Sequence, residues 1–482
     1  MNYPRIIQGG MGAGVSSWRL ARAVSMEGQL GVVSGTALAT LVLRVLQSGD
    51  PGGHVARARD AFPNRRIAER VYGKYFVEGG VPAGSAFKRH PMYTLSPPSE
   101  LVELTVFAAF AEVYLAKEGH EGLVGINLLE KIVLPNLPSL YGALLAGVDY
   151  VLMGAGIPME IPGALDALAD HQPFALRVAV AGAPKGAEHC IQFDPAAIVP
   201  APASRLKRPL FLAIIASNVL AVALKKRANG RIDGFVVEGP TAGGHNAPPR
   251  GAPQLNEKGE PVYGTKDIVD LAELKKLGLP FWLAGSCASP ERLREALDQG
   301  AAGIQAGTAF ALCEESGMTP ELRAALVQGL REGSLEVFTD PLASPTGFPF
   351  KVAQLPGTMA TQEDYGHRPR RCDLGYLRVA YMKENGGIDF RCPAEPVDQF
   401  VAKGGSEAET AGRKCLCNGL TGTVGYPQRQ PGGYLELALV TIGDDVRRMA
   451  RYFTNGRTTI TAAEVIRLIL GEDEPLPSPS PA

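Results

Sequence analysis

PFWLAGSCASPERLREALDQGAAGIQAGT, residues 280–308, contains the pattern that decides the fold. Two apolar runs, PFWLAGS and GIQAGT, each end in glycine followed by a small hydroxyl residue. The segment between them has the marks of a helix, with Ser289 as the N-cap, Pro290 at the first helical position and Gly300 past the end. Runs that are apolar at consecutive positions are typical of strands buried on both faces, as in a parallel sheet. The stretch therefore predicts two successive strand–helix units.

Six further runs of the same kind precede this stretch, and helical patterns lie between most of them. They are RIIQGG (5–10), LGVVSG (30–35), LVGINL (123–128), YVLMGAG (150–156), LFLAIIAS (210–217) and GFVVEG (234–239). Eight such units predict an α/β protein with a TIM-type (β/α)8 barrel. A doubly wound open sheet is the alternative.

Two segments depart from a plain barrel. Residues 50–122 are expected to form an insertion of extra helices, and residues 174–200 a small inserted hairpin, although FALRVAV within it could instead be a barrel strand. We expect residues 1–335 to form the barrel domain and residues 336–471 an additional α+β region that acts as a lid. The tail from 472 to 482 is predicted to be disordered.

Composition excludes several classes of function. Lys plus Arg number 48 and Asp plus Glu 49, which gives no reason to expect binding to nucleic acid or to an anionic membrane. The most apolar run, residues 210–224, is too short to span a bilayer, so a buried strand followed by a helix is the better interpretation. The N-terminus MNYPRIIQGG lacks the basic start and apolar core of a signal peptide. These features predict a soluble, cytoplasmic protein.

Four of the seven cysteines lie close together in the C-terminal region, at positions 372, 392, 415 and 417. Such a group could hold zinc or an iron–sulfur cluster. The spacing contains no CxxC, however, so structural free thiols are favoured and no metal site is predicted. Among the others, only Cys287 lies where its reactivity is of interest.

Chemistry in a (β/α)8 barrel takes place at the carboxyl ends of the strands. LAGS (283–286) and QAGT (305–308) place free backbone N–H groups at two neighbouring strand ends, which favours a phosphate site. No GxxxxGK[ST] motif is present, so this is not a P-loop. IQGGMGAG (7–14) is not interpreted as a dinucleotide fingerprint, because the acidic residue that it requires would be Glu27, inside a helical pattern.

Five motifs in order, IIQGGMG, GINL, AGGH, LAGS and GIQAGT, resemble the nitronate monooxygenases, once called 2-nitropropane dioxygenases, and the related flavin-dependent enoyl-acyl-carrier-protein reductases. The resemblance covers roughly residues 4–355. It implies a TIM-type barrel with a smaller lid domain, and FMN as the cofactor.

The resemblance also implies a role for particular residues. His245 corresponds to the catalytic histidine, which takes a proton from an acidic carbon or stabilises developing negative charge. The residues implied to bind the cofactor are Gly9, Gly10, Met11, Asn127, Gly243 and Gly244 around the ring, and Gly285, Ser286, Gln305, Gly307 and Thr308 at the phosphate. The chain departs from the family at Asn246, where arginine is frequent, and at Ser286, where a second glycine is frequent.

Three functions follow from this resemblance. The first is an FMN-dependent monooxygenase that oxidises nitronates or nitroalkanes with O2, with His245 as the base for neutral nitroalkanes. The second is an FMN-dependent reductase that uses NAD(P)H to reduce an enoyl thioester. The third is a non-catalytic FMN-binding protein. In each enzymatic case the partner is a small-molecule substrate, and the sequence does not fix the oligomeric state.

Overall fold

The computed structural model describes residues 3–472, except residues 201, 203 and 455. Residues 473–482, which make up most of the tail predicted to be disordered, lie outside the described residues. None of the described helices is long and apolar enough to cross a membrane.

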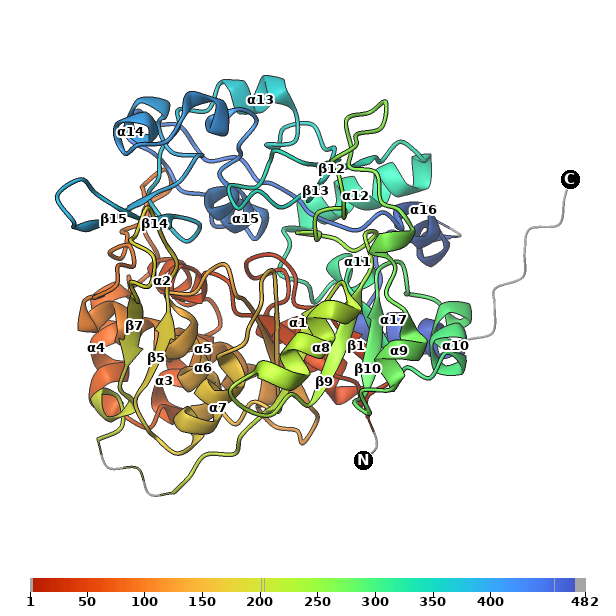
Figure 1. The fold of residues 1–482 in the computed structure, drawn as a ribbon, viewed down its shortest axis with the longest axis horizontal. Helices are drawn as coiled ribbons and strands as arrows, with labels where there is room; N and C mark the ends of the chain where they lie inside the picture. The colour runs from red at the N-terminus through yellow and green to blue at the C-terminus, as the bar shows by residue number, and fades with distance from the viewer. Residues whose placement is uncertain (1–2, 201, 203, 455, 473–482) are drawn as a thin grey trace, which may run out of the picture.

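Eight parallel strands form a closed barrel (Figure 1). In sheet order they are β1 (Ile6–Gln8), β11 (Gly303–Ala306), β10 (Phe281–Ala284), β9 (Gly234–Glu238), β8 (Leu210–Ile215), β4 (Tyr150–Gly154), β3 (Val124–Leu129) and β2 (Gly31–Ser34). The two ends of this order meet, because the N–H of Gln8 donates to the carbonyl of Leu30 at 2.9 Å and the N–H of Leu30 donates to that of Ile6 at 3.1 Å. The eight predicted runs are these eight strands. The (β/α)8 prediction is confirmed and the open doubly wound sheet is wrong.

Both faces of the barrel strands are buried, as the consecutive apolar residues predict. Leu152, Leu212, Val236 and Trp282 belong to a cluster of apolar side chains from alternating strand positions. The indole N–H of Trp282 donates to the carbonyl of Pro4 at 2.8 Å, so its only polar atom is satisfied inside the core. The interior is therefore a packed core that supports a site at one end.

A layer of helices surrounds the barrel (Figure 1). Its members are α1 (Trp18–Met26), α5 (Ser99–Lys117), α6 (Asn136–Leu145), α7 (Ile161–Ala169), α8 (Asn218–Arg227), α9 (Leu271–Lys275), α10 (Pro290–Asp298), α11 (Thr308–Ala311) and α12 (Pro320–Glu332). Helix α10 begins as predicted, with the Ser289 hydroxyl accepting from the N–H of Arg292 at 3.2 Å. The run 210–224 is β8 followed by α8, as expected.

The predicted helical insertion contains α3 (His54–Ala61) and α4 (Arg65–Tyr75), which follow α2 (Leu38–Gln47). It also contains α5, whose 19 residues are mostly buried. Helix α5 packs on α6, α1 and α2, so it is the helix of the barrel layer between β2 and β3. The extra material is therefore the pair α3 and α4 together with the loop that leads to α5.

Residues 174–200 form the predicted hairpin. β5 (Phe174–Arg177) pairs antiparallel with β7 (Cys190–Phe193), and the 3-10 turn η1 (Pro195–Ala197) follows. FALRVAV is therefore not a barrel strand. Its last part, β6 (Val180–Ala181), pairs with β14 of the C-terminal region instead.

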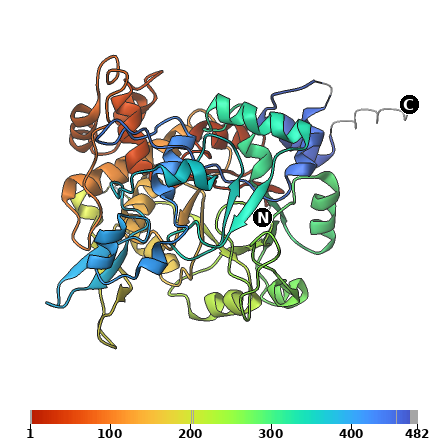
Figure 2. The same cartoon turned by 90° about the horizontal axis from the view of Figure 1, so that it is seen from above.

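The C-terminal region lies over the carboxyl end of the barrel (Figures 1 and 2). Its helices and strands are short. They are β12 (Val337–Asp340), β13 (Phe350–Ala353), α13 (Gln362–Gly366), β14 (Val379–Met382), β15 (Ile388–Arg391), α14 (Val397–Ala402), η3 (Glu407–Thr410), α15 (Leu416–Thr423), α16 (Val446–Met449) and η4 (Ala450–Phe453). The 3-10 turn η2 (Thr265–Asp267) lies earlier in the chain, between β9 and α9. The chain then returns to the barrel wall, where α17 (Ala462–Leu470) packs against α1 and α10.

Gly303→Ala tests the seam between β11 and the residue that precedes β1. A Cβ at Gly303 would lie 2.0 Å from the carbonyl oxygen of Arg5, and this backbone atom of the neighbouring strand segment cannot move away cheaply. We expect the free energy of unfolding to fall by about 3 kcal/mol. Gly73→Ala is the control, because a Cβ there meets nothing within 4 Å inside helix α4, and it should leave stability unchanged or raise it by up to about 1 kcal/mol. Equal urea midpoints for the two variants would contradict the tight seam.

Candidate functional site

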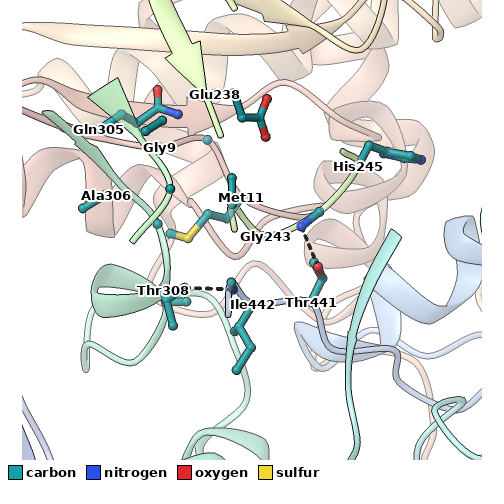
Figure 3. A pocket seen from close by; sticks show the side chains of 18 of the residues that line it. Gly9, Met11, Glu238, Gly243, His245, Gln305, Ala306, Thr308, Thr441 and Ile442 are labelled. Carbon is teal, nitrogen blue, oxygen red and sulfur yellow. Dashed lines mark hydrogen bonds between the residues drawn. The ribbon is translucent and has the colours of Figure 1, made fainter. Parts of the chain in front are cut away.

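A cavity opens at the carboxyl ends of the barrel strands, beneath the C-terminal region (Figure 3). Every residue predicted to bind the cofactor or act in catalysis lines it. They are Gly9, Gly10, Met11, Asn127, Gly243, Gly244, His245, Gly285, Ser286, Gln305, Gly307 and Thr308. The barrel closure brings together strand ends that are nearly 300 residues apart in the chain.

The end of β1 passes close to β3. A Cβ at Gly10 would lie only 2.4 Å from the Cβ of Asn127, so this position accepts only glycine without a shift. The amide nitrogen of Asn127 donates to the Gly10 carbonyl at 3.2 Å. Its amide oxygen is buried without a partner, as is that of Gln305 on β11. Both residues line the cavity, so two acceptors are available there for donors on a ligand.

His245 follows β9 and is held by residues of the C-terminal region. Its Nε2 forms a 2.7 Å hydrogen bond with the Ser344 hydroxyl, and its ring meets that of Phe350 edge-on at 4.7 Å. Burial, followed by the nearby charge of Lys131, lowers the pKa of His245 to about 4. The imidazole is therefore neutral at physiological pH and only weakly basic.

Glu238, the last residue of β9, is an ionisable group of the cavity that the motifs did not identify. Burial raises the pKa of its carboxyl to about 8, and the charge of Lys351 offsets this only in part. Figure 3 shows Glu238 and His245 among the side chains that line the pocket. The sequence does carry a signal for Glu238: it is a carboxylate at the end of an apolar strand, where burial of its charge costs free energy.

A second cavity adjoins the first at these two residues. Its lining includes residues 214–217 at the end of β8, the loop from 246 to 250, Tyr263 and Phe348. Glu238 and His245 line both cavities, whose volumes are about 180 Å³ for the first and about 290 Å³ for the second. The two side chains therefore stand between two spaces, each able to hold a different molecule.

The segment Thr441–Asp445, far along the chain, crosses the end of the cavity that was predicted to hold a phosphate. The N–H of Gly244 donates to the Thr441 hydroxyl at 2.9 Å, and the N–H of Gly443 donates to the Thr308 hydroxyl at 2.9 Å (Figure 3). No local motif marks this segment, because its contacts to the barrel span more than a hundred residues.

FMN fits the ring end of this cavity better than the phosphate end. The glycines and the unpartnered oxygens of Asn127 and Gln305 suit a flat ring with its own hydrogen-bond donors. Thr308 already accepts from Gly443 and bonds the Asp445 carboxyl. Burial raises the pKa of Asp445, so this carboxyl takes up a proton more readily than usual when an anion is bound beside it.

Cys287 lines the same cavity but is a poor nucleophile. Its Sγ donates to the Gly285 carbonyl at 3.1 Å, and burial raises its pKa to about 11. The thiolate, which is the reactive form, is therefore scarce at neutral pH.

Residues 170–339 match the family model described as nitronate monooxygenase. A nitronate monooxygenase from Pseudomonas aeruginosa is 38% identical over 94 residues, which are 20% of this chain and 25% of that protein. Residues 170–339 of this chain are therefore similar to the nitronate monooxygenase family. The resemblance inferred from the motifs is confirmed, although the chain spans only about a quarter of the curated relative that it matches.

Two solved structures are similar over nearly the whole chain. FabK from Thermotoga maritima has 16% identity and a TM-score of 0.48, with 98% of this chain and 93% of that chain covered. Nitroalkane oxidase from Streptomyces ansochromogenes has 14% identity and a TM-score of 0.47, with 97% and 96% covered. The barrel itself is established by the strand pairing.

Ser286→Gly tests the departure from the family at this position. Ser286 has φ 54, in the left-handed region that favours glycine. We expect the substitution to raise the free energy of unfolding by about 0.5–1 kcal/mol, because relief of left-handed strain outweighs the added freedom of the unfolded chain. In contrast, Ser289→Gly removes a helix cap at an extended backbone position and should lower stability by a few tenths of a kcal/mol, roughly. A loss of stability at both positions, measured by urea unfolding, would show that Ser286 is held by its side chain.

Proposed function

We propose that this chain is an FMN-dependent oxidoreductase whose two reactants lie on either side of Glu238 and His245. The supporting observation is that both side chains line two adjoining cavities. The first cavity has the glycines and free amide oxygens that suit a flavin ring, and the second is left for a substrate.

FMN, when bound, would supply the redox chemistry. Gly9, Gly10, Met11, Asn127, Gly243, Gly244 and Gln305 would hold its ring, while Gly285, Ser286, Gly307 and Thr308 would hold its phosphate. Met11 offers a soft apolar face to the ring. The C-terminal segment 441–445 would cover the cofactor and exclude water from it.

The protonation states of the two ionisable residues favour proton donation over proton abstraction. Glu238 has a pKa near 8 and so holds a proton at neutral pH, at the boundary between the cavities. His245 has a pKa near 4 and is a weak base, which makes it a poor group for deprotonating a neutral nitroalkane. Its neutral ring, fixed by Ser344, is suited to positioning a polar group of the substrate.

Reduction of an activated double bond, such as that of an enoyl thioester, by NAD(P)H is therefore the reaction that the geometry favours. Glu238 would protonate the carbon next to the carbonyl. The second cavity, at about 290 Å³, also suits a substrate larger than a small nitronate.

Oxidation of a nitronate with O2 is the second candidate, because the matched family model and the curated relative are both nitronate monooxygenases. A nitronate is already ionised and requires no base. The weak basicity of His245 then restricts the substrate to the pre-ionised form, in contrast to the initial expectation that neutral nitroalkanes are also deprotonated.

Steady-state assays of the purified holoprotein separate the candidates. We expect a flavin spectrum that fits FMN after extraction, and NAD(P)H consumption that depends on a short enoyl thioester. O2 uptake with propionate 3-nitronate, without any NAD(P)H-dependent reduction, would favour the second candidate. A bound flavin with neither activity would support the non-catalytic hypothesis, and a protein that takes up no flavin from excess FMN would contradict all three.

Glu238→Gln tests the proton donor. The amide keeps the shape of the side chain but cannot give up a proton in the same way, so reductase activity should fall by about 10²–10⁴-fold with FMN content unchanged. The wild-type rate should hold below pH 8 and fall as the pH rises through about 8, where the carboxyl loses its proton.

Glu130→Gln is the matched control. Burial also raises the pKa of Glu130, but this residue lines neither cavity. It should leave both the rate and the pH profile unchanged. Loss of activity in both variants, or a pH profile that Glu238→Gln does not alter, would remove Glu238 from the reaction.

A further inference from the structure

The C-terminal region brings four cysteines from three separate segments to one small cavity. Cys372, Cys392, Cys415 and Cys417 all line it. They come from three segments: the loop between α13 and β14, the end of β15, and the first turn of α15. The sequence grouped these four cysteines but favoured free thiols because no CxxC motif is present; the fold brings all four to one cavity.

Backbone N–H groups lie near three of the four sulfurs. They are those of Ala394 near Cys392, of Asn418 near Cys415 and of Leu377 near Cys417. The Asn418 side chain adds a second donor to Cys415 at 3.6 Å. A thiol is a weak acceptor, whereas a thiolate bound to metal is a strong one, and such donors are typical around metal-bound sulfur.

The cluster lies in a part of the fold that has little regular secondary structure. Its regular elements are short, and its own apolar core is small. Charged groups are buried beside it, including the pair Arg368 and Glu436 at 2.6 Å, both fully buried. Loop-rich modules of this kind commonly need disulfides or a metal for stability.

Two simpler roles for the four thiols fit poorly. All four are free thiols in this structure, so they do not pair as disulfides here. Among the described residues, no group of three or more His, Cys, Asp and Glu side chains is arranged to hold a single metal ion. A zinc ion with bonds of about 2.3 Å draws its four sulfurs close together, whereas an iron–sulfur cluster spreads them around a larger centre.

We propose that Cys372, Cys392, Cys415 and Cys417 are the thiolate ligands of an iron–sulfur cluster that occupies the cavity between them. The centre would hold three segments of the C-terminal region together. Its site is separate from the flavin cavity, so it does not depend on the proposed function.

The cluster would also act on the position of His245, through the backbone next to Cys415. The N–H of Lys414 donates to the carbonyl of Ala343 at 2.8 Å, and the Arg413 guanidinium donates to that of Ser344 at 2.7 Å. Ser344 in turn bonds His245 at 2.7 Å. Ligation of Cys415 would therefore fix the position of Ser344, which orients the His245 ring.

The experiment is metal and sulfide analysis of the full chain, purified without oxygen. For a [4Fe–4S] cluster we expect about four iron and four acid-labile sulfide per chain, and an electron paramagnetic resonance signal after reduction with dithionite. Cys417→Ser should lose most of the iron while it keeps its flavin. Cys190→Ser is the control, since Cys190 lies in β7 outside this cavity and should retain full iron content.

The iron and sulfide content of the wild-type protein decides the proposal even if Cys417→Ser does not fold. Stoichiometric zinc in place of iron and sulfide would overturn the cluster. So would a metal-free protein that takes up no iron and sulfide on anaerobic reconstitution, or iron that remains at full level in a folded Cys417→Ser variant.

Discussion

The parallel pairing of β1 with both β11 and β2 is the constraint on which the rest of the structure depends. Two backbone hydrogen bonds between Leu30 and its partners Ile6 and Gln8 turn an eight-stranded sheet into a cylinder. All eight carboxyl ends then point to one rim. Gly10 and Asn127, more than a hundred residues apart, come into van der Waals contact there, and His245 and Gln305 face the same space.

Burial at that rim acts on two ionisable residues in opposite directions. It raises the pKa of Glu238 to about 8 and lowers that of His245 to about 4, because in both cases it disfavours the charged form. Both side chains are therefore uncharged at neutral pH. The boundary between the cavities thus offers a proton and a fixed neutral ring rather than an ion pair, which suits a neutral conjugated substrate next to a flat cofactor.

The sequence predicted the eight strands because each one carries its signal locally, as an apolar run that ends in a small residue. The helix caps at Ser289 and Gly300 are local signals of the same kind. The motifs likewise identified twelve site residues, and all of them line one cavity. What could not be predicted depends on contacts between distant segments: the cover formed by Thr441–Asp445, and the convergence of the four cysteines.

The same distant contacts determine how a cofactor could enter. The segment 441–445 is held to the barrel rim by hydrogen bonds to Gly244, Thr308 and the carbonyl of Thr241, each worth about 1 kcal/mol. Its Asp444 carboxylate also pairs with the buried Lys351 of β13 at 2.7 Å. The flanking chain is anchored more firmly, by the buried helix α17 on one side and by the region around the cysteines on the other. Opening the site at this segment therefore requires breaking the ion pair of Asp444 with Lys351 as well as the hydrogen bonds to the rim.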